Sequence, residues 1–129
     1  LLGKTYSDLT LEQQENFDRL WLMINEVRTL WGKPMKVTSS IRSMEEHLEI
    51  YRRQGITDIK NIPMKSKHLI AAAVDIYDPG LHLSHWLKSN PKVLEDFNLF
   101  CELGNTNWVH FQILPFKSYR KGGTRWFKP

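Results

Sequence analysis

The sequence predicts an α+β fold in which helices pack on one face of a small antiparallel sheet. A long amphipathic helical pattern opens the chain, and short β-branched or apolar segments follow it. The last two such segments are joined by a tight Gly-Asn-Thr-Asn loop at residues 104–107, so they should pair antiparallel. We expect residues 1–129 to form one domain, because this length suits a single core.

The first expected element is a helix over residues 10–31. Thr10 and Gln13 have the spacing of a capping box, and apolar residues recur after them at helical intervals. Gly32, followed by Pro34, ends the helix.

The remaining elements follow from shorter patterns. Apolar or β-branched runs bounded by turn residues predict strands, whereas capping pairs and amphipathic spacing predict helices. In chain order we expect a strand at 36–40, a helix at 43–53 opened by a Ser43–Glu46 capping box, a loop at 58–67, a strand at 71–77, short helices at 81–88 and 91–96, strands at 97–103 and 108–114, and an irregular basic tail at 115–129 with a last short strand.

Composition and charge narrow the classes of function. The net charge of +4 suits an anionic partner, although an ordinary solvated surface explains it equally well. No recognition helix or aromatic–basic sheet motif is present, so we expect no nucleic-acid partner. We also expect no transmembrane segment and no secretory signal peptide. The single cysteine, Cys101, cannot form an internal disulfide or a Cys-rich zinc site, and is expected to be a small buried hydrophobe.

Two polar residues interrupt apolar strand segments. Asp75 lies within A-A-A-V-D-I and His110 within W-V-H-F-Q-I, where Trp108, His110 and Gln112 should share one face. A buried carboxylate needs a compensating cation. Together with His68, at the end of the preceding loop, these residues form a two-histidine, one-carboxylate set typical of catalytic zinc. The pattern alone leaves open a buried His–Asp hydrogen-bonded pair without metal.

The other three histidines have no such partners. His47 lies in the second expected helix, near the rim of a cleft. His82 and His85 lie on a short helix at a spacing that can bind metal, but a solvated helix face explains them better.

Three segments together resemble the zinc peptidoglycan peptidases. Residues 66–75, S-K-H-L-I-A-A-A-V-D, resemble the S-x-H-x-x-G-x-A-x-D motif of this group. Residues 108–110, W-V-H, resemble its last ligand motif, and residues 39–43, S-S-I-R-S, resemble its S-G-x-R-S segment. The group comprises D-alanyl-D-alanine carboxypeptidases, D-Ala-D-Ala dipeptidases and phage L-alanyl-D-glutamate endopeptidases with a Hedgehog-like fold. The resemblance covers about residues 36–112, and the tail also looks like that of phage members.

The resemblance implies roles for individual residues. Arg42 would bind substrate and stabilise the oxyanion of the transition state, although a salt bridge at the start of a helix is the alternative. Ser66 would bind substrate or hold a ligand histidine, or else is a turn residue, and Trp108 would contact substrate. The implied zinc ligands are His68, Asp75 and His110.

Two positions depart from the family pattern. The motif glycine is replaced by Ala71. The acidic residue three positions before the last histidine, which acts as the general base, is replaced by Asn107, which cannot accept a proton at neutral pH. Glu102 precedes the hairpin loop and should face the same side as His110, so we expect it to be the base. The alternative is that Glu102 only orients His110.

The resulting hypothesis is a zinc metallopeptidase that hydrolyses peptidoglycan stem peptides, of the D,D-carboxypeptidase or L-Ala-D-Glu endopeptidase type. A phage or prophage protein is expected, made in the host cytoplasm and acting at the cell wall during lysis, either as a monomer or within a phage particle. The alternative is a weakly active or inactive zinc-containing module that binds cell wall or builds the virion, which Asn107 and Ala71 favour.

Overall fold

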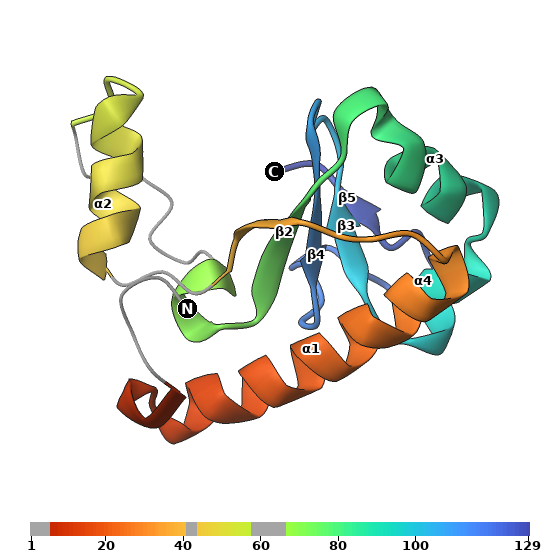
Figure 1. Ribbon diagram of the computed structural model, residues 1–129, viewed down its shortest axis with the longest axis horizontal. Coiled ribbons are helices and arrows are strands. Elements are labelled where there is room, and N and C mark those ends of the chain that lie inside the picture. Colours follow the sequence, from red (N-terminus) through yellow and green to blue (C-terminus); the bar gives the residue numbers. More distant parts are fainter. Residues whose placement is uncertain (1–5, 41–43, 58–66) are drawn as a thin grey trace.

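The α+β class is confirmed by the computed structural model (Figure 1), which describes residues 6–40, 44–57 and 67–129, with backbone alone for residues 44–47. Its helices are α1 (Leu11–Trp31), α2 (Met44–Arg53), α3 (His82–Ser89) and α4 (Lys92–Asp96). Its strands are β1 (Val37–Ser39), β2 (Ala73–Tyr77), β3 (Phe100–Glu102), β4 (Trp108–Gln112) and β5 (Trp126–Phe127). Short 3₁₀ turns are η1 (Tyr6–Asp8), η3 (Lys67–Ile70) and η4 (Pro79–Leu81).

The five strands form one mixed sheet in the order β1-β2-β4-β3-β5. All neighbours are antiparallel except β3 and β5, which run parallel, so the prediction of a purely antiparallel sheet was wrong at this edge. Strands β3 and β4 are joined by residues 103–107, a loop one residue longer than predicted, and β5 is the short strand expected in the tail. The register of β2 and β4 places Asp75 opposite His110, so the two polar residues that interrupt the apolar segments are cross-strand neighbours.

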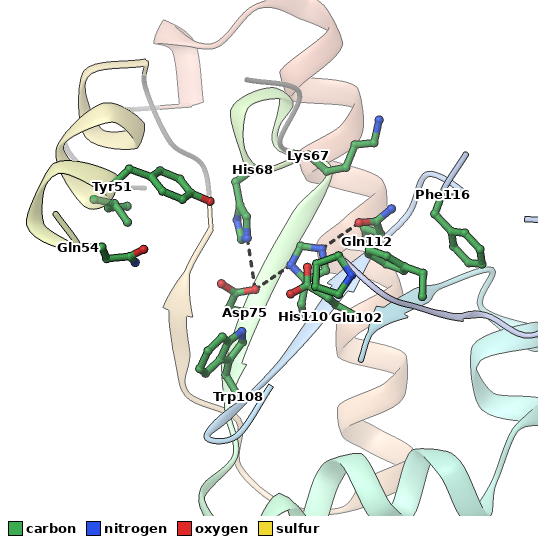
Figure 2. Close-up of a pocket in the computed structure, with 13 residues that line it drawn as sticks. Tyr51, Gln54, Lys67, His68, Asp75, Glu102, Trp108, His110, Gln112 and Phe116 are labelled. Carbon is green, nitrogen blue, oxygen red and sulfur yellow. Dashed lines mark hydrogen bonds and ion pairs between the residues drawn. The ribbon is translucent and has the colours of Figure 1, made fainter. Parts of the chain in front are cut away.

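The two faces of the sheet have different surroundings. One face carries the apolar residues of β2 and β4, which pack against α1, α3 and α4 in the hydrophobic core. The prediction that all helices lie on one face was wrong for α2, which lines a cleft on the other face (Figure 2). The predicted alternation along β4 is confirmed: Val109 and Phe111 are buried in this core, whereas His110 and Gln112 lie on the opposite face. The polar residues of β4 therefore lie on the face of the sheet opposite the hydrophobic core.

Helix α1 begins and ends as the sequence predicts. The Thr10 side chain accepts from the Gln13 backbone N–H at 3.1 Å, and the Gln13 side chain accepts from the Thr10 N–H at 2.9 Å. Gly32 ends the helix in the left-handed conformation, with a φ of 76°.

Polar side chains of α1 also donate hydrogen bonds to the backbone segments that carry the candidate site. The Asn16 amide donates to the Ile70 carbonyl, at the end of η3, at 2.9 Å. The Arg19 guanidinium donates to the Ile113 carbonyl, just after β4, at 2.8 Å. Helix α1 therefore ties η3 and the end of β4 into one frame.

Two strands begin later than their apolar runs suggest. Strand β2 begins at residue 73 because Ala71, which follows η3, has a φ of 60°, a left-handed conformation that costs an L-residue about 1–2 kcal/mol. Strand β3 begins at residue 100 because α4 is capped at Phe97 and Asn98 turns the chain with a φ of 51°. Apolar content predicted strand at these positions, but local turns take precedence there.

Two further expectations cannot be compared with the structure. The Ser43–Glu46 capping box and most of the loop at 58–67 lie outside the described residues, although α2 itself ends before Gly55 as expected. Among the helices that the structure describes, we find none with the length and apolarity needed to span a membrane.

Asp78 holds the connection between β2 and α3. Its side chain is buried, and its two carboxylate oxygens accept from the backbone N–H groups of Leu83 at 2.9 Å and Ser84 at 3.0 Å. These bonds satisfy N–H groups that the first turn of a helix leaves without partners.

We predict that Asp78→Ala lowers the free energy of unfolding by about 2 kcal/mol, because two buried N–H groups lose their acceptor. Urea unfolding measures the change. Asp96→Ala, which removes an exposed carboxylate on α4, is the control and should change the value by less than about 0.5 kcal/mol. Equal effects of the two substitutions would contradict this role of Asp78.

Candidate metal centre

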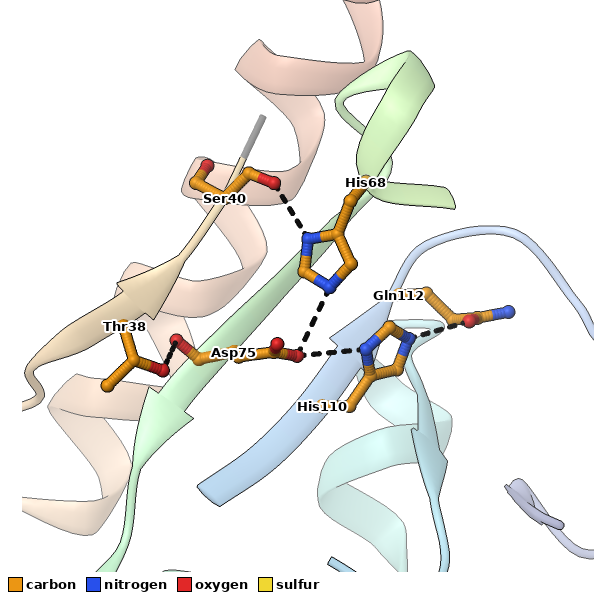
Figure 3. A network of polar contacts seen from close by, with 6 residues as sticks. All are labelled: Thr38, Ser40, His68, Asp75, His110 and Gln112. Atoms are coloured by element: carbon orange, nitrogen blue, oxygen red, sulfur yellow. Dashed lines mark hydrogen bonds and ion pairs between the residues drawn. The ribbon is translucent and has the colours of Figure 1, made fainter. Parts of the chain in front are cut away.

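Three side chains that the sequence singled out converge on one point. His68 comes from η3, Asp75 from β2 and His110 from β4, and one ligand atom from each lies within 4.8 Å of the others. Asp75 Oδ1 lies 2.9 Å from His110 Nδ1 and 3.3 Å from His68 Nε2 (Figures 2 and 3). All three residues are buried.

A backbone carbonyl on the side of the ring away from Asp75 fixes the orientation of His68. Its Nδ1 lies 2.7 Å from the backbone carbonyl of Ser40, at the end of β1 (Figure 3). A carbonyl oxygen only accepts, so Nδ1 carries the hydrogen and donates. In the neutral ring, the lone pair on Nε2 therefore points toward Asp75.

His110 is fixed in the same manner by Gln112. The Gln112 amide nitrogen donates to the Leu114 carbonyl at 2.8 Å, which turns the amide oxygen toward the imidazole. That oxygen lies 2.9 Å from His110 Nε2 and accepts its hydrogen. The lone pair of the neutral ring is then on Nδ1, which also faces Asp75 (Figure 3).

Two neutral imidazoles in these tautomers would direct lone pairs at a carboxylate, an arrangement that is stable only with a cation between them. Either a proton or a metal ion can supply the positive charge. Metal-bound histidines commonly donate their second ring nitrogen to a protein acceptor, as both rings do here. The donor set and its orientation therefore fit a metal ion, and His68, Asp75 and His110 can hold one.

Without a metal ion, hydrogen bonds and charge among the three side chains shift the pKa values of Asp75 and His110. Burial would raise the pKa of the Asp75 carboxyl, but the hydrogen bonds and charges of His110 and His68 outweigh burial and hold this pKa well below its usual range. Burial would lower the pKa of His110, but the hydrogen bond and charge of Asp75, with smaller effects of Gln112 and Glu102, raise it. A metal ion at Nδ1 of His110 would compete with a proton for the same lone pair.

The three side chains lie in a cleft of about 460 Å³. Tyr51 and Gln54 of α2 line one side, and Phe116 and Phe127 of the C-terminal segment line the other. Figure 2 shows α2 facing the sheet across this opening. The volume falls within the range typical of small-ligand sites.

Glu102 lies in the same cleft as the candidate ligands. Phe100 and Cys101 of β3 pair with Gln112 and Phe111 of β4, so the next residue, Glu102, comes opposite His110. It lines the cleft beside His110 (Figure 2), which is the placement expected from the hairpin. Its role as a base stays a prediction.

The hairpin loop adds a contact that the sequence did not reveal. With the Asn105 amide turned to satisfy both neighbours, its nitrogen donates to Glu102 Oε1 at 3.1 Å and its oxygen accepts from Trp108 Nε1 at 3.3 Å. Asn105 thus links the carboxylate to the indole ring across the hairpin. Asn107 is exposed, and its backbone carbonyl accepts from the Asp78 N–H at 2.7 Å.

The other candidate residues are distributed as follows. Trp108 lines the cleft and is 37% exposed, so a ligand in the cleft can contact it. Arg42, Ser66 and the side chain of His47 lie outside the described residues. His82 and His85 are exposed on α3, as expected, and Cys101 is buried, where burial raises the pKa of its thiol.

Sequence reasoning missed the groups that orient the histidines. The position of Gln112 could have been noticed, because Gln112 follows His110 by two residues on β4 and so lies on the same face. The carbonyl of Ser40 gave no signal, since every residue has one and only the fold brings this one to His68.

We predict opposite pH trends with and without metal. Because the pKa of His110 is raised in the folded state, its ion pair with Asp75 stabilises metal-free protein fully below about pH 6.5 and is lost as pH rises through the folded value. In chelator, Tm should therefore fall from about pH 6 to about pH 8, whereas the increase in Tm caused by added zinc should grow. Thermal scans of wild type and of His85→Gln should agree, and an increase in Tm independent of pH would contradict this assignment.

We predict that Gln112→Leu weakens metal binding by about 10- to 100-fold, because His110 loses the acceptor that fixes its tautomer. Competition with a chromophoric zinc chelator measures the affinity. Gln54→Leu removes an amide from the same cleft but from α2, and should change the affinity less than about twofold. Equal affinities of wild type and Gln112→Leu would exclude the proposed orientation.

Comparison of the chain with models of known protein families, with curated proteins and with solved structures gave no match in any of the three.

Proposed function

We propose that this chain is a zinc peptidase that hydrolyses peptide bonds in the stem peptides of bacterial peptidoglycan. The observation that carries the proposal is the convergence of His68, Asp75 and His110 in a cleft that also contains Glu102. Two imidazoles and one carboxylate are a ligand set that suits zinc and leaves a position open for catalysis.

The sequence motifs support the same family and its Hedgehog-like fold. The segments at residues 66–75 and 108–110 follow one another in the order of the family's motifs. Ala71 stands where the motif has glycine, and its left-handed φ of 60° is a conformation that glycine adopts without strain. The glycine of the motif thus has a backbone explanation that Ala71 meets at some cost in energy, which weakens one argument for an inactive module.

Zinc bound to these ligands would supply a Lewis acid for the peptide carbonyl and would lower the pKa of water at the open position toward about 7. Glu102 lies in the cleft opposite His110, which supports the proposal that its carboxylate would accept a proton from the attacking water and return it to the leaving amine. Asn105 holds one oxygen of Glu102 by donating to it and so limits the rotation of the carboxylate. By the resemblance, Arg42 would stabilise the oxyanion, with Ser66 and Trp108 contacting substrate.

The biological setting that we propose follows from the same resemblance. The enzyme would be a D,D-carboxypeptidase or an L-Ala-D-Glu endopeptidase encoded by a phage or prophage and acting on the cell wall. The second candidate is a zinc-containing module that binds wall or builds the virion without cutting, and Asn107 at the usual acidic position favours it.

We predict that Glu102→Gln lowers the release of new amino groups from purified peptidoglycan by about 10²- to 10⁴-fold while bound zinc stays at the wild-type level. Glu95→Gln, an exposed position on α4, is the control and should keep full activity. Wild-type turnover by Glu102→Gln would show that another group is the base. Zinc binding without amine release by the wild-type protein would favour the non-cutting module.

A further inference from the structure

The net positive charge of the chain comes from its last 27 residues. Residues 103–129 contain no Asp or Glu, whereas residues 1–102 contain 13 of the 18 basic residues and all 14 acidic ones. Residues 103–129 therefore carry more positive charge than the net charge of +4 of the whole chain. The five basic residues of this segment are Lys117, Arg120, Lys121, Arg125 and Lys128.

Three of these cations line a groove of about 900 Å³ formed by the C-terminal segment. They are Lys117, Arg120 and Lys128, all exposed, and no acidic residue lines the groove with them. Among the residues described, none of the three has a carboxylate within ion-pair distance. Their charges therefore remain available to an anionic ligand.

Arg125 shows by contrast how a cation of this segment serves the fold. It donates to the Asn98 side chain at 3.0 Å and lies over the rings of Phe100 and Tyr119, at 4.7 and 5.4 Å from their centres. Arg125 is thus engaged with the sheet, and it does not line the groove.

A row of aromatic rings extends from the candidate metal centre to this groove. Phe127 lies 6.1 Å from the His110 ring, Phe116 stacks on Phe127 at 5.1 Å, and Tyr119 packs on Phe116 at 5.6 Å, between ring centres. Phe116 and Phe127 line both the metal cleft and the groove. A ligand chain that enters the metal cleft can therefore continue along these rings to the cations.

We propose that the groove is the second half of the substrate cleft and binds carboxylates of the wall peptide next to the bond that is cut. This inference rests on the proposed function. Lys117, Arg120 and Lys128 would pair with the carboxylates of the peptide. The row of aromatic rings would contact the apolar alanyl side chains and aliphatic stems that lie between those carboxylates. The groove would thus select acidic over neutral peptides.

The test measures co-sedimentation of the full chain with purified peptidoglycan in the presence of chelator, so that it does not depend on zinc or on catalysis. The triple variant Lys117→Gln, Arg120→Gln, Lys128→Gln should bind at least about tenfold more weakly than wild type. The control Arg28→Gln, Lys33→Gln, Lys92→Gln removes the same charge from exposed positions elsewhere and should bind within about twofold of wild type. A Tm of the first variant within a few degrees of wild type shows that it folds.

Chemically modified walls identify the anion. Wild-type protein should bind walls stripped of phosphate polymers by hydrofluoric acid as well as untreated walls, and should lose at least about tenfold on walls whose carboxyl groups are amidated. Unchanged binding of the groove variant, or of amidated walls, would overturn the proposal. Loss of binding on removal of phosphate polymers would overturn it too, by assigning the groove to phosphodiesters. A lack of peptidase activity, measured separately with zinc, would count against the proposed function and leave this result standing.

Discussion

The structure depends on the buried carboxylate of Asp75, which lies between two imidazole rings whose other nitrogens are already committed to protein acceptors. Such a group is stable only if a positive charge occupies the space between the three side chains. In the absence of metal a proton can supply that charge, since Asp75 raises the pKa of His110, and a metal ion held by the three side chains would supply it instead. Folding, pH response and metal affinity are therefore linked through a few atoms.

The surrounding fold serves to bring these atoms together. The sheet register sets Asp75 opposite His110, and α1 holds η3, which carries His68, through the Asn16 side chain. The apolar face of the same strands packs against three helices, so the polar residues are carried by strands that are anchored in the hydrophobic core. Ligands carried by packed strands are oriented before metal binds, which reduces the ordering that binding would otherwise require.

Much of this arrangement could be predicted from the sequence because the relevant signals are local. The capping box of α1, the alternation along β4 and the short hairpin before Trp108 all depend on neighbouring residues, and all three are confirmed. The late start of β2 could not be predicted, because Ala71 gives no local sign of its left-handed backbone. The Ser40 carbonyl and the Asn105 bridge depend on tertiary contacts, and the groove of the tail depends on how an irregular segment folds back on β3.

The metal content of the purified chain tests the central claim most directly. Wild-type protein incubated with zinc and then dialysed should retain one zinc per chain, and Asp75→Ala should retain almost none because the ligand set loses its carboxylate. Asp96→Ala, which removes an exposed carboxylate on α4, should bind zinc like wild type. Absence of zinc from the wild-type protein, or equal zinc in wild type and Asp75→Ala, would contradict the assignment of His68, Asp75 and His110 as a metal centre.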